Sequence, residues 1–400
     1  MRYTPKTELD TRITRLQQQL AARQLDGALI VQNADLFYFA GTVQQSQLYV
    51  PRAGEPILMT RKSFKRATEE SALKCIVPLS SPREVPRILR ENGYGAPRYL
   101  GLEMDVLPAN LFLAFGEILE AQCEDISPAV RRVRAVKSEY ELAALKRAAR
   151  IGARTLRAGP ALITEGITEV ELAGKFEAIA RSLGHPGHVK FRLWNNDVFY
   201  GHLMAGKRAA LPSYLSSPTG GQGLTPAFPH GPSEHKIRRG EPVFVDYAFV
   251  SDGYIVDQTR VFAIGGLPDK LVRAHQSMIE IQNAIARAAK PGVTGGEIYQ
   301  MALEMAEERG YRDHFQGLGK DRVMFVGHGV GLELDEYPLL AKGQAMPLEE
   351  GMVIAVEPKV NFSGFGTVGV ENTYVITEQG AKRITLTPDD ITIVDGKRRA

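Results

Sequence analysis

Two long apolar runs near the middle of the chain each carry one aspartate, and these carboxylates limit what the chain can fold into. Residues 242–250 contain Asp246, and residues 253–262 contain Asp257. Two β-rich runs that flank a short turn signal predict a β-hairpin. A turn at Ser251-Asp252 would place the two aspartates directly opposite each other on one face of the hairpin, with their Cβ atoms about 5 Å apart.

Two facing carboxylates in an apolar setting repel each other. At about 4 Å and an effective dielectric constant near 20, the repulsion costs about 4 kcal/mol. Either a cation lies between the two groups, or one of them holds a proton. A purely structural arrangement is also open, in which one aspartate pairs with Arg260 or Lys236.

Three further residues place a titratable group among apolar residues or glycines. Glu357 ends one apolar run, and Glu371 lies inside another. His328 stands between two glycines, where the backbone can approach a ligand closely. A single histidine in such a place is more often structural than a ligand. The prediction of a metal site therefore depends on all five residues taken together.

Together, four carboxylates and one imidazole match the ligand shell of a dinuclear site for Mn, Co, Fe or Zn. Without cations, this many acidic groups inside strands would destabilise the fold. The sequence therefore predicts a site for two divalent metal ions. The predicted ligands are Asp246, Asp257, His328, Glu357 and Glu371.

The length of 400 residues fits two domains better than one core. Residues 1–130 alternate between helix and strand, beginning with a helical apolar stripe that runs to about Arg23, and this predicts an α/β domain. Residues 131–400 turn to long, mostly antiparallel strands interrupted by helices at about 267–289 and 295–308. The second domain is therefore predicted to be α+β.

Two other segments carry weaker signals. The junction between the predicted domains contains Arg131, Arg132, Arg134 and Lys137, and we interpret this basic patch as a solvated linker. Residues 201–240 are rich in Gly, Pro, Ser and His. Such a stretch is either a disordered loop or the lining of a site.

Charge and composition argue against several classes of protein. Lys and Arg number 49, Asp and Glu number 46, and the net charge of +3 gives no reason to expect nucleic acid or a membrane as a partner. The start of the chain lacks the apolar core of a signal peptide, and no apolar run is long enough to span a bilayer. Two cysteines form no disulfide framework. We therefore expect a soluble, cytoplasmic protein.

The order and spacing of these residues resemble the pita-bread metallopeptidases, which include methionine aminopeptidases, aminopeptidase P, prolidase and creatinase. The motifs that carry the resemblance extend over most of the chain. They are Leu25–Leu29, Phe39–Gly41, Arg134–Glu139, the two hairpin aspartates followed by Thr259-Arg260, Gly327–Gly331, Glu357-Pro358 and Glu371-Asn372. The resemblance implies a creatinase-type α/β N-terminal domain, an α+β pita-bread catalytic domain, and a homodimer.

The resemblance also implies a role for each residue of the predicted site. Asp257 and Glu371 would bridge both metals. His328 and Glu357 would complete the coordination of one metal, and Asp246 that of the other. Glu357 would act as general base and carry the proton of the metal-bridging water to the leaving amine. The implied activity is hydrolysis of a C–N bond in a peptide or small amide, of the Xaa-Pro peptidase type.

Three positions concern the substrate. His230 falls where the family has a substrate-contacting histidine, although an ordinary loop histidine stays open. Asp335 stands where the peptidases have a second histidine that donates to the scissile carbonyl, and Leu339 stands where prolidases tend to have an arginine. An ionised Asp335 cannot donate and would favour a substrate with a positive group; alternatively, it hydrogen-bonds backbone in its turn. Both departures count against plain Xaa-Pro dipeptides.

Two other kinds of function remain open. The same scaffold could act on a small non-peptide substrate, as a creatinase-like C–N hydrolase or a dimethylsulfoniopropionate-lyase-like enzyme. It could also be a pita-bread binding module without chemistry. Relatives of that last kind have lost ligands, whereas this chain has all five, and metal analysis would separate these alternatives.

Overall fold

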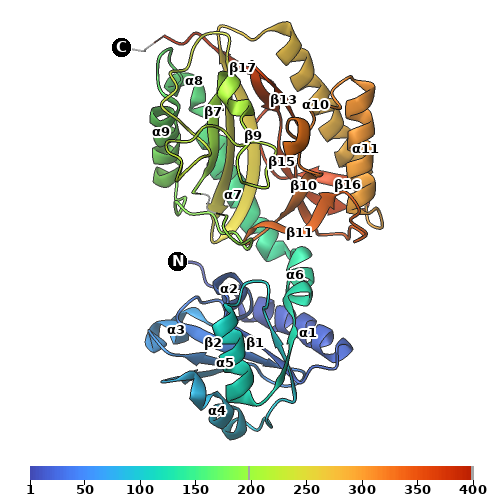
Figure 1. Ribbon diagram of the computed structural model, residues 1–400. Coiled ribbons are helices and arrows are strands. Elements are labelled where there is room, and N and C mark those ends of the chain that lie inside the picture. Colours follow the sequence, from blue (N-terminus) through green and yellow to red (C-terminus); the bar gives the residue numbers. More distant parts are fainter. Residues whose placement is uncertain (197–198, 398–400) are drawn as a thin grey trace. The chain divides into compact units, whose positions relative to one another are not determined.

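The computed structural model describes residues 1–196 and 199–397. The chain divides into two compact units, Met1–Arg134 and Ala135–Ala400 (Figure 1). None of the described helices is long and apolar enough to cross a membrane.

The first unit is built on a six-stranded sheet in the order β4-β3-β2-β1-β5-β6, in which β1 is antiparallel to β2 and parallel to β5. The strands are β1 (Gly27–Ile30), β2 (Ser46–Pro51), β3 (Ile57–Thr60), β4 (Cys75–Pro78), β5 (Tyr99–Leu102) and β6 (Gln122–Asp125). The helices are α1 (Lys6–Ala22), α2 (Asn33–Ala40), α3 (Phe64–Glu70), η1 (Pro82–Glu84), α4 (Val85–Glu91), α5 (Ala109–Leu119) and α6 (Ser127–Ala135). The predicted α/β architecture is confirmed.

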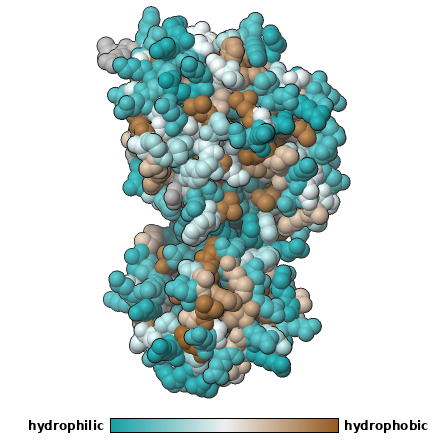
Figure 2. Space-filling model, in the orientation of Figure 1, coloured by the Kyte–Doolittle hydropathy of each residue, from teal (hydrophilic) through white to brown (hydrophobic). Residues whose placement is uncertain are grey.

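Local sequence explains the helices of this unit. The predicted stripe on α1 buries Ile13, Leu16 and Leu20 against the sheet side, at the spacing of one helical face. Helix α5 is apolar on more than one face, and it leaves Leu111 and Leu113 41% and 61% exposed. Figure 2 shows an apolar patch on the surface over this helix.

Two residues of the basic patch at positions 131–137 do not lie in the solvated linker that the sequence predicted. Arg134 lies on α6, is buried, and forms an ion pair with the buried Asp35 of α2. Lys137 is also buried, and its Nζ lies 3.2 Å from Glu336 Oε2 in the second unit's own fold. The prediction was wrong for both residues because each has an acidic partner far away in the sequence, and a paired charge can be buried.

The second unit contains two main sheets and a small one. Their orders are β17-β9-β8-β7, β11-β10-β12-β15-β16 and β13-β14, and neighbouring strands are antiparallel except for β17 and β9. The strands are β7 (Gly201–Ala205), β8 (Pro242–Ser251), β9 (Tyr254–Ile264), β10 (Phe325–Val330), β11 (Leu334–Ala341), β12 (Val353–Val356), β13 (Lys359–Phe362), β14 (Gly366–Gly369), β15 (Asn372–Thr377), β16 (Gly380–Arg383) and β17 (Thr392–Val394). The predicted α+β character with mostly antiparallel strands is confirmed.

Helices cover the outer faces of these sheets. They are α7 (Glu139–Arg157), α8 (Gly159–Leu162), α9 (Glu169–Ser182), η2 (Gly206–Ala210), α10 (Asp269–Ala288), α11 (Gly295–Glu308) and η3 (Gly319–Asp321). Helix α7 packs on β8 and β9, and α9 packs on α7 and β7. Helices α10 and α11 lie on the other side of the unit, against β14, β16 and β11 (Figure 1). The inner faces of the strands are thereby left for a site.

The β8–β9 hairpin forms as predicted, but its turn is one residue further along the chain. Asp252 and Gly253 are the central turn residues, both with positive φ (51° and 86°), as the tight hairpin turn with the native twist requires. Asp246 therefore pairs with Thr259, and Asp257 pairs with Ala248. The predicted direct pairing of the aspartates was wrong by two positions. Because side chains alternate with a period of two, Asp246 and Asp257 still share one face.

Close approach of α7 holds this hairpin in place. A Cβ built on Gly152 of α7 would lie 2.1 Å from Gln258 Nε2 and 2.7 Å from Phe249 Cδ2. Both contacted residues are buried and belong to β9 and β8. Glycine is therefore the residue that allows the helix backbone to contact the strands at this point.

This contact predicts opposite effects for two glycine-to-alanine substitutions inside helices. Gly152→Ala should lower the free energy of unfolding by about 1–3 kcal/mol, because the added methyl group overpacks the hairpin. Gly174→Ala on α9, where nothing lies within 4 Å of the added Cβ, should raise it by about 0.5–1 kcal/mol through helix propensity. Denaturant unfolding of both variants measures the difference. Equal stabilisation by the two substitutions would contradict the packing described.

Candidate active site

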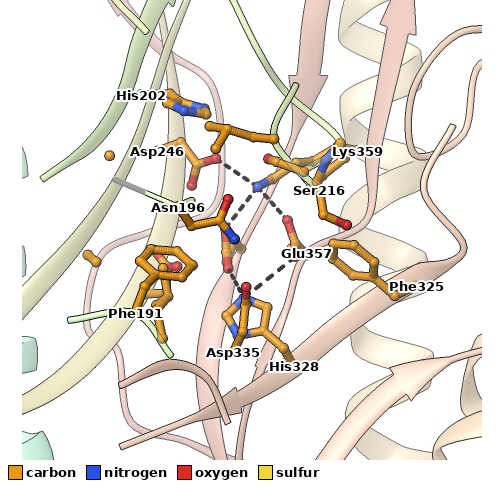
Figure 3. Close-up of a pocket in the computed structure, with 18 of the residues that line it drawn as sticks. Phe191, Asn196, His202, Ser216, Asp246, Phe325, His328, Asp335, Glu357 and Lys359 are labelled. Carbon is orange, nitrogen blue, oxygen red and sulfur yellow. Dashed lines mark hydrogen bonds and ion pairs between the residues drawn. The ribbon is translucent and has the colours of Figure 1, made fainter. Parts of the chain in front are cut away.

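The five predicted ligands come from five strand segments and line one cavity (Figure 3). Asp246 lies on β8, Asp257 on β9 and His328 on β10. Glu357 directly follows β12, and Glu371 directly precedes β15. The structure thus brings together residues that are more than a hundred positions apart in the sequence.

Three of these residues form a compact, buried cluster. One ligand atom each from Asp257, His328 and Glu371 lies within 4.8 Å of the others. His328 Nε2 is 3.6 Å from Glu357 Oε1 and 3.9 Å from Glu371 Oε1. Across residues 1–196 and 199–397, Glu371 Oε1 is buried and has no hydrogen-bond partner. An imidazole nitrogen and carboxylate oxygens that face one another fit a divalent transition-metal ion.

A residue that the sequence reasoning missed, Lys359, lies among the other oxygens of the site. Its Nζ is 2.7 Å from Glu357 Oε2, 2.9 Å from Asp246 Oδ2 and 3.0 Å from Glu371 Oε2 (Figure 3). The side chain is only 1% exposed. A signal was present in the sequence, since a lysine directly after Glu357-Pro358 begins an apolar strand, and lysine is almost never fully buried unless it is paired.

Arg260 and Lys236, the alternative ion-pair partners of the two aspartates, do not neutralise them. Arg260 is buried, and it donates to Asn372 Oδ1 and to the Glu371 carbonyl. Lys236 is exposed. The cation of the aspartate pair within the described chain is instead Lys359, which contacts Asp246.

Asp335 faces the cavity, but its carboxylate is paired with an imidazole. Its backbone adopts the left-handed conformation with φ 61°, and its Oδ1 lies 3.3 Å from His328 Nδ1. The Gly329 carbonyl oxygen lies 3.1 Å from the same nitrogen. Both acceptors favour a proton on Nδ1, which leaves Nε2 free to bind a metal.

The start of strand β11, which carries Asp335, is held by buried ion pairs on either side of that residue. Arg192 Nη1 lies 3.4 Å from Glu333 Oε2, and Lys137 Nζ lies 3.2 Å from Glu336 Oε2. The Glu333 backbone N–H also donates to Glu336 Oε1. These contacts fix the position of Asp335 beside the imidazole.

Two histidines lie next to each other beyond Asp246. His202 of β7 lines the cavity, is in register with Asp246, and has its Nδ1 3.1 Å from Thr219 Oγ1. Burial lowers the pKa of His202 to about 4, so its ring is neutral at pH 7. His230, the predicted substrate contact, lies outside the cavity lining, with its ring 5.4 Å from that of His202 and 4.7 Å from that of Phe228.

The segment 201–240 therefore lines a site, as one of its two interpretations held. Leu215, Ser216, Ser217 and Pro218 contribute to the cavity wall. Sequence reasoning did not single out His202, because its link to Asp246 depends on the pairing of β7 with β8 rather than on any local motif.

The charges of the site are unevenly balanced. Burial opposes ionisation of Asp246, but the Lys359 ammonium outweighs it and lowers the pKa of Asp246 to about 2. Burial and the charge of Asp246 raise the pKa of Asp257 to about 7. Burial also raises the pKa of Glu357 and, together with Asp257, raises that of Glu371 well above its ordinary value. Lys359 thus neutralises Asp246 best and leaves the other carboxylates in need of a further cation.

The walls of the cavity combine acidic and other polar groups with apolar side chains. The volume of the cavity is about 70 Å³. Among the described lining residues, Lys359 is the single lysine or arginine. The apolar ones are Phe191, Tyr200, Leu215, Pro218, Ala248, Phe325 and Leu334. Leu339 faces His328 across the β10–β11 ladder and does not line the cavity.

Comparison with known families places this chain. Residues 143–378 match the metallopeptidase family M24, and residues 12–136 match the creatinase/prolidase N-terminal domain. The chain belongs to the M24 metallopeptidase family, which implies divalent metal ions as cofactors. The predicted fold class, a creatinase-type α/β domain followed by a pita-bread catalytic domain, is confirmed.

Its relatives within the family are Xaa-Pro dipeptidase-like metallopeptidases. The chain is 28% identical to the Xaa-Pro dipeptidase of Pyrococcus furiosus over 383 residues, which cover 95% of this chain and 99% of the relative. It is similar in structure to the Xaa-Pro dipeptidase of Bacillus anthracis (TM-score 0.82, 26% identity, 96% and 100% of the two chains covered). It is also similar to an X-Pro aminopeptidase of Thermotoga maritima (TM-score 0.78, 25% identity, 96% and 99% covered).

The raised pKa of Asp257 predicts that metal binding strengthens with pH. Between its ordinary pKa of 3.8 and about 7, the folded metal-free chain holds a proton that the unfolded chain has released. The stability of the metal-free protein therefore falls over that interval as pH rises. A metal ion must displace the same proton, so Mn should raise the melting temperature more at about pH 8 than at about pH 5.

Thermal melts with and without Mn across this pH range measure the effect. Asp257→Asn is the matched variant, because it removes the titrating carboxyl. In this variant the melting temperature of the metal-free protein should depend less on pH. An Mn-induced shift that is equal at both ends of the range would contradict the role given to Asp257.

Proposed function

We propose that the chain is a cytoplasmic, metal-dependent hydrolase of the Xaa-Pro peptidase type, which cleaves a peptide or amide C–N bond in the cavity described. The observation that carries the proposal is the buried cluster of Asp257, His328 and Glu371, in which Nε2 and an otherwise unsatisfied carboxylate oxygen face each other. The names of the relatives support peptide substrates.

The donor set fits Mn, Co, Fe or Zn, since imidazole and carboxylate are ligands that these ions share. The five predicted residues, Asp246, Asp257, His328, Glu357 and Glu371, are sufficient in number for the two ions expected from the sequence. Lys359, however, contacts three of the five. A bound divalent ion would polarise the scissile carbonyl and lower the pKa of an attacking water.

Glu357 is the proposed general base. Its Oε1 faces His328 Nε2, and its Oε2 accepts from Lys359 at 2.7 Å. Burial raises the pKa of this carboxyl, which brings it closer to neutral pH, where a group can both take and release a proton. Glu357 would accept the proton of the attacking water and return it to the nitrogen of the leaving amine.

Asp335 is proposed to act in two ways. Through Nδ1 it orients His328 and fixes its tautomer. It also adds negative charge to a cavity in which the one described cation, Lys359, is already paired with carboxylates. Among the described lining residues, no cationic side chain is left to pair with a free product carboxylate. Longer Xaa-Pro peptides, or amides with a positive group, therefore suit the cavity better than plain Xaa-Pro dipeptides.

The acidic cavity also supports the second candidate function, which is action on a small non-peptide substrate. A small cationic non-peptide compound would meet the same carboxylates, and either C–N hydrolysis or elimination could follow. A binding module without chemistry is disfavoured, because relatives of that kind have lost ligands, whereas all five predicted ligands line this cavity.

The central test is hydrolysis of Xaa-Pro-Xaa peptides by protein loaded with Mn or Co. A chelator should abolish the activity, and added metal should restore it. Glu357→Gln should lower kcat by about 10²-fold or more, because the amide cannot accept the proton. Metal content of each protein is measured in parallel.

Glu304→Gln is the matched control, because Glu304 is an exposed residue of α11. It should leave kcat unchanged. Activity that survives complete metal removal would overturn the proposed function. A near-normal kcat in Glu357→Gln would show that another group moves the proton.

Asp335 generates a prediction about specificity. Asp335→His restores a donor, and one such donor can be worth about 3 kcal/mol of transition-state stabilisation. We expect kcat/KM for Xaa-Pro dipeptides to rise relative to that for Xaa-Pro-Xaa peptides and for a cationic amide. Efficient cleavage of Xaa-Pro dipeptides by the unaltered protein, with no change in Asp335→His, would show that Asp335 has no part in specificity.

A further inference from the structure

Glu357 and Glu371 each divide their two carboxylate oxygens between Lys359 and His328. The Oε2 atoms lie 2.7 and 3.0 Å from Lys359 Nζ, and the Oε1 atoms lie 3.6 and 3.9 Å from His328 Nε2. Figure 3 shows the lysine entering the carboxylate cluster from one side and the histidine from the other. Both glutamates therefore bridge two distinct positions.

The two aspartates are divided in the same way. Asp246 Oδ2 lies 2.9 Å from Lys359 Nζ. Asp257 instead belongs to the cluster with His328 and Glu371. Each position thus has one aspartate of its own and shares the two glutamates. The position beside Asp246 holds the Lys359 ammonium group. At the position beside Asp257, ligand atoms of His328 and the carboxylates face one another.

The lysine is built into its position. Its ammonium has three N–H donors, and three carboxylate oxygens from three different residues surround it. The backbone of Lys359 is fixed as well, because its N–H donates to Gln316 Oε1 and its carbonyl accepts from the Gln316 N–H. The side chain is not a surface lysine that has folded inward.

We propose that the Lys359 ammonium takes the place of one of the two cations, and that the chain binds a single divalent ion between Asp257, His328, Glu357 and Glu371. The inference rests on the proposed function in so far as it concerns the same site. It revises the expectation of two ions that the ligand set alone suggested. The oxygens that a second ion would need are those that Lys359 already engages.

Metal stoichiometry tests the inference directly. The purified protein is stripped with a chelator, equilibrated with Mn, freed of excess, and analysed by mass spectrometry for metal per chain. We expect about one ion, in contrast to the pair found in two-metal hydrolytic sites. Anomalous scattering from a crystal of the same protein should place the ion beside His328 and not beside Asp246. Two ions per chain, or none, would overturn the inference.

Substitutions separate the two positions. Lys359→Ala should bind about two ions, because it removes the charge and frees the oxygens, whereas the matched Lys342→Ala, at an exposed lysine, should still bind one. His328→Ala should lose the ion, and Asp246→Asn should keep it. A Lys359→Ala protein that binds one ion, or an Asp246→Asn protein that binds none, would overturn the inference that the Lys359 ammonium takes the place of a metal ion. If Lys359→Ala does not fold, the unaltered protein and Asp246→Asn still decide the question.

The outcome is distinguishable from that of the peptidase assay. One ion beside His328 without hydrolysis of any peptide would uphold the inference and overturn the proposed function. Two ions with metal-dependent hydrolysis would overturn the inference and uphold the proposed function.

Discussion

Mutual repulsion of buried carboxylates is the constraint on which the second unit depends. Asp246, Asp257, Glu357 and Glu371 are brought together by strands of both main sheets. Two ionised carboxylates at about 4 Å repel each other by about 4 kcal/mol at an effective dielectric constant of 20. Such a cluster persists only where some carboxyls hold a proton, as Asp257 does below about pH 7, or where positive charge is supplied. Lys359 supplies part of it permanently, and the arrangement of the remaining atoms around His328 Nε2 calls for the rest.

The surrounding fold is organised to keep these groups from moving apart. Helix α7 approaches the β8–β9 hairpin at Gly152, so the two aspartates are backed by packed helix. Arg260, next to the site on β9, binds the Glu371 carbonyl and Asn372 and so joins β9 to β15. Arg260, which does not line the cavity, therefore holds together the strand that carries Asp257 and the strand that directly follows Glu371.

Much of this could be predicted from the sequence, because strands and ligands leave local signals. The face shared by Asp246 and Asp257 was predicted correctly even though the turn was misplaced, since a shift of two positions preserves alternation. Other features depend on partners far away in the chain. Lys359 meets Asp246 across 113 positions, and Lys137 meets Glu336 across 199. A local pattern can mark such a lysine, as at the start of β13, but only the placement of its acidic partners shows that it is buried.

The burial of Lys137 also bears on how such a catalytic unit can be inherited. It is the third residue of the second unit, and its ammonium holds Glu336, the neighbour of Asp335. Removing one partner of a buried ion pair typically costs about 3–5 kcal/mol. A gene fusion or excision that cut the chain just after this lysine would remove the ammonium group that the buried Glu336 faces. A recombination point on the N-terminal side of Lys137 would keep this ion pair within the second unit.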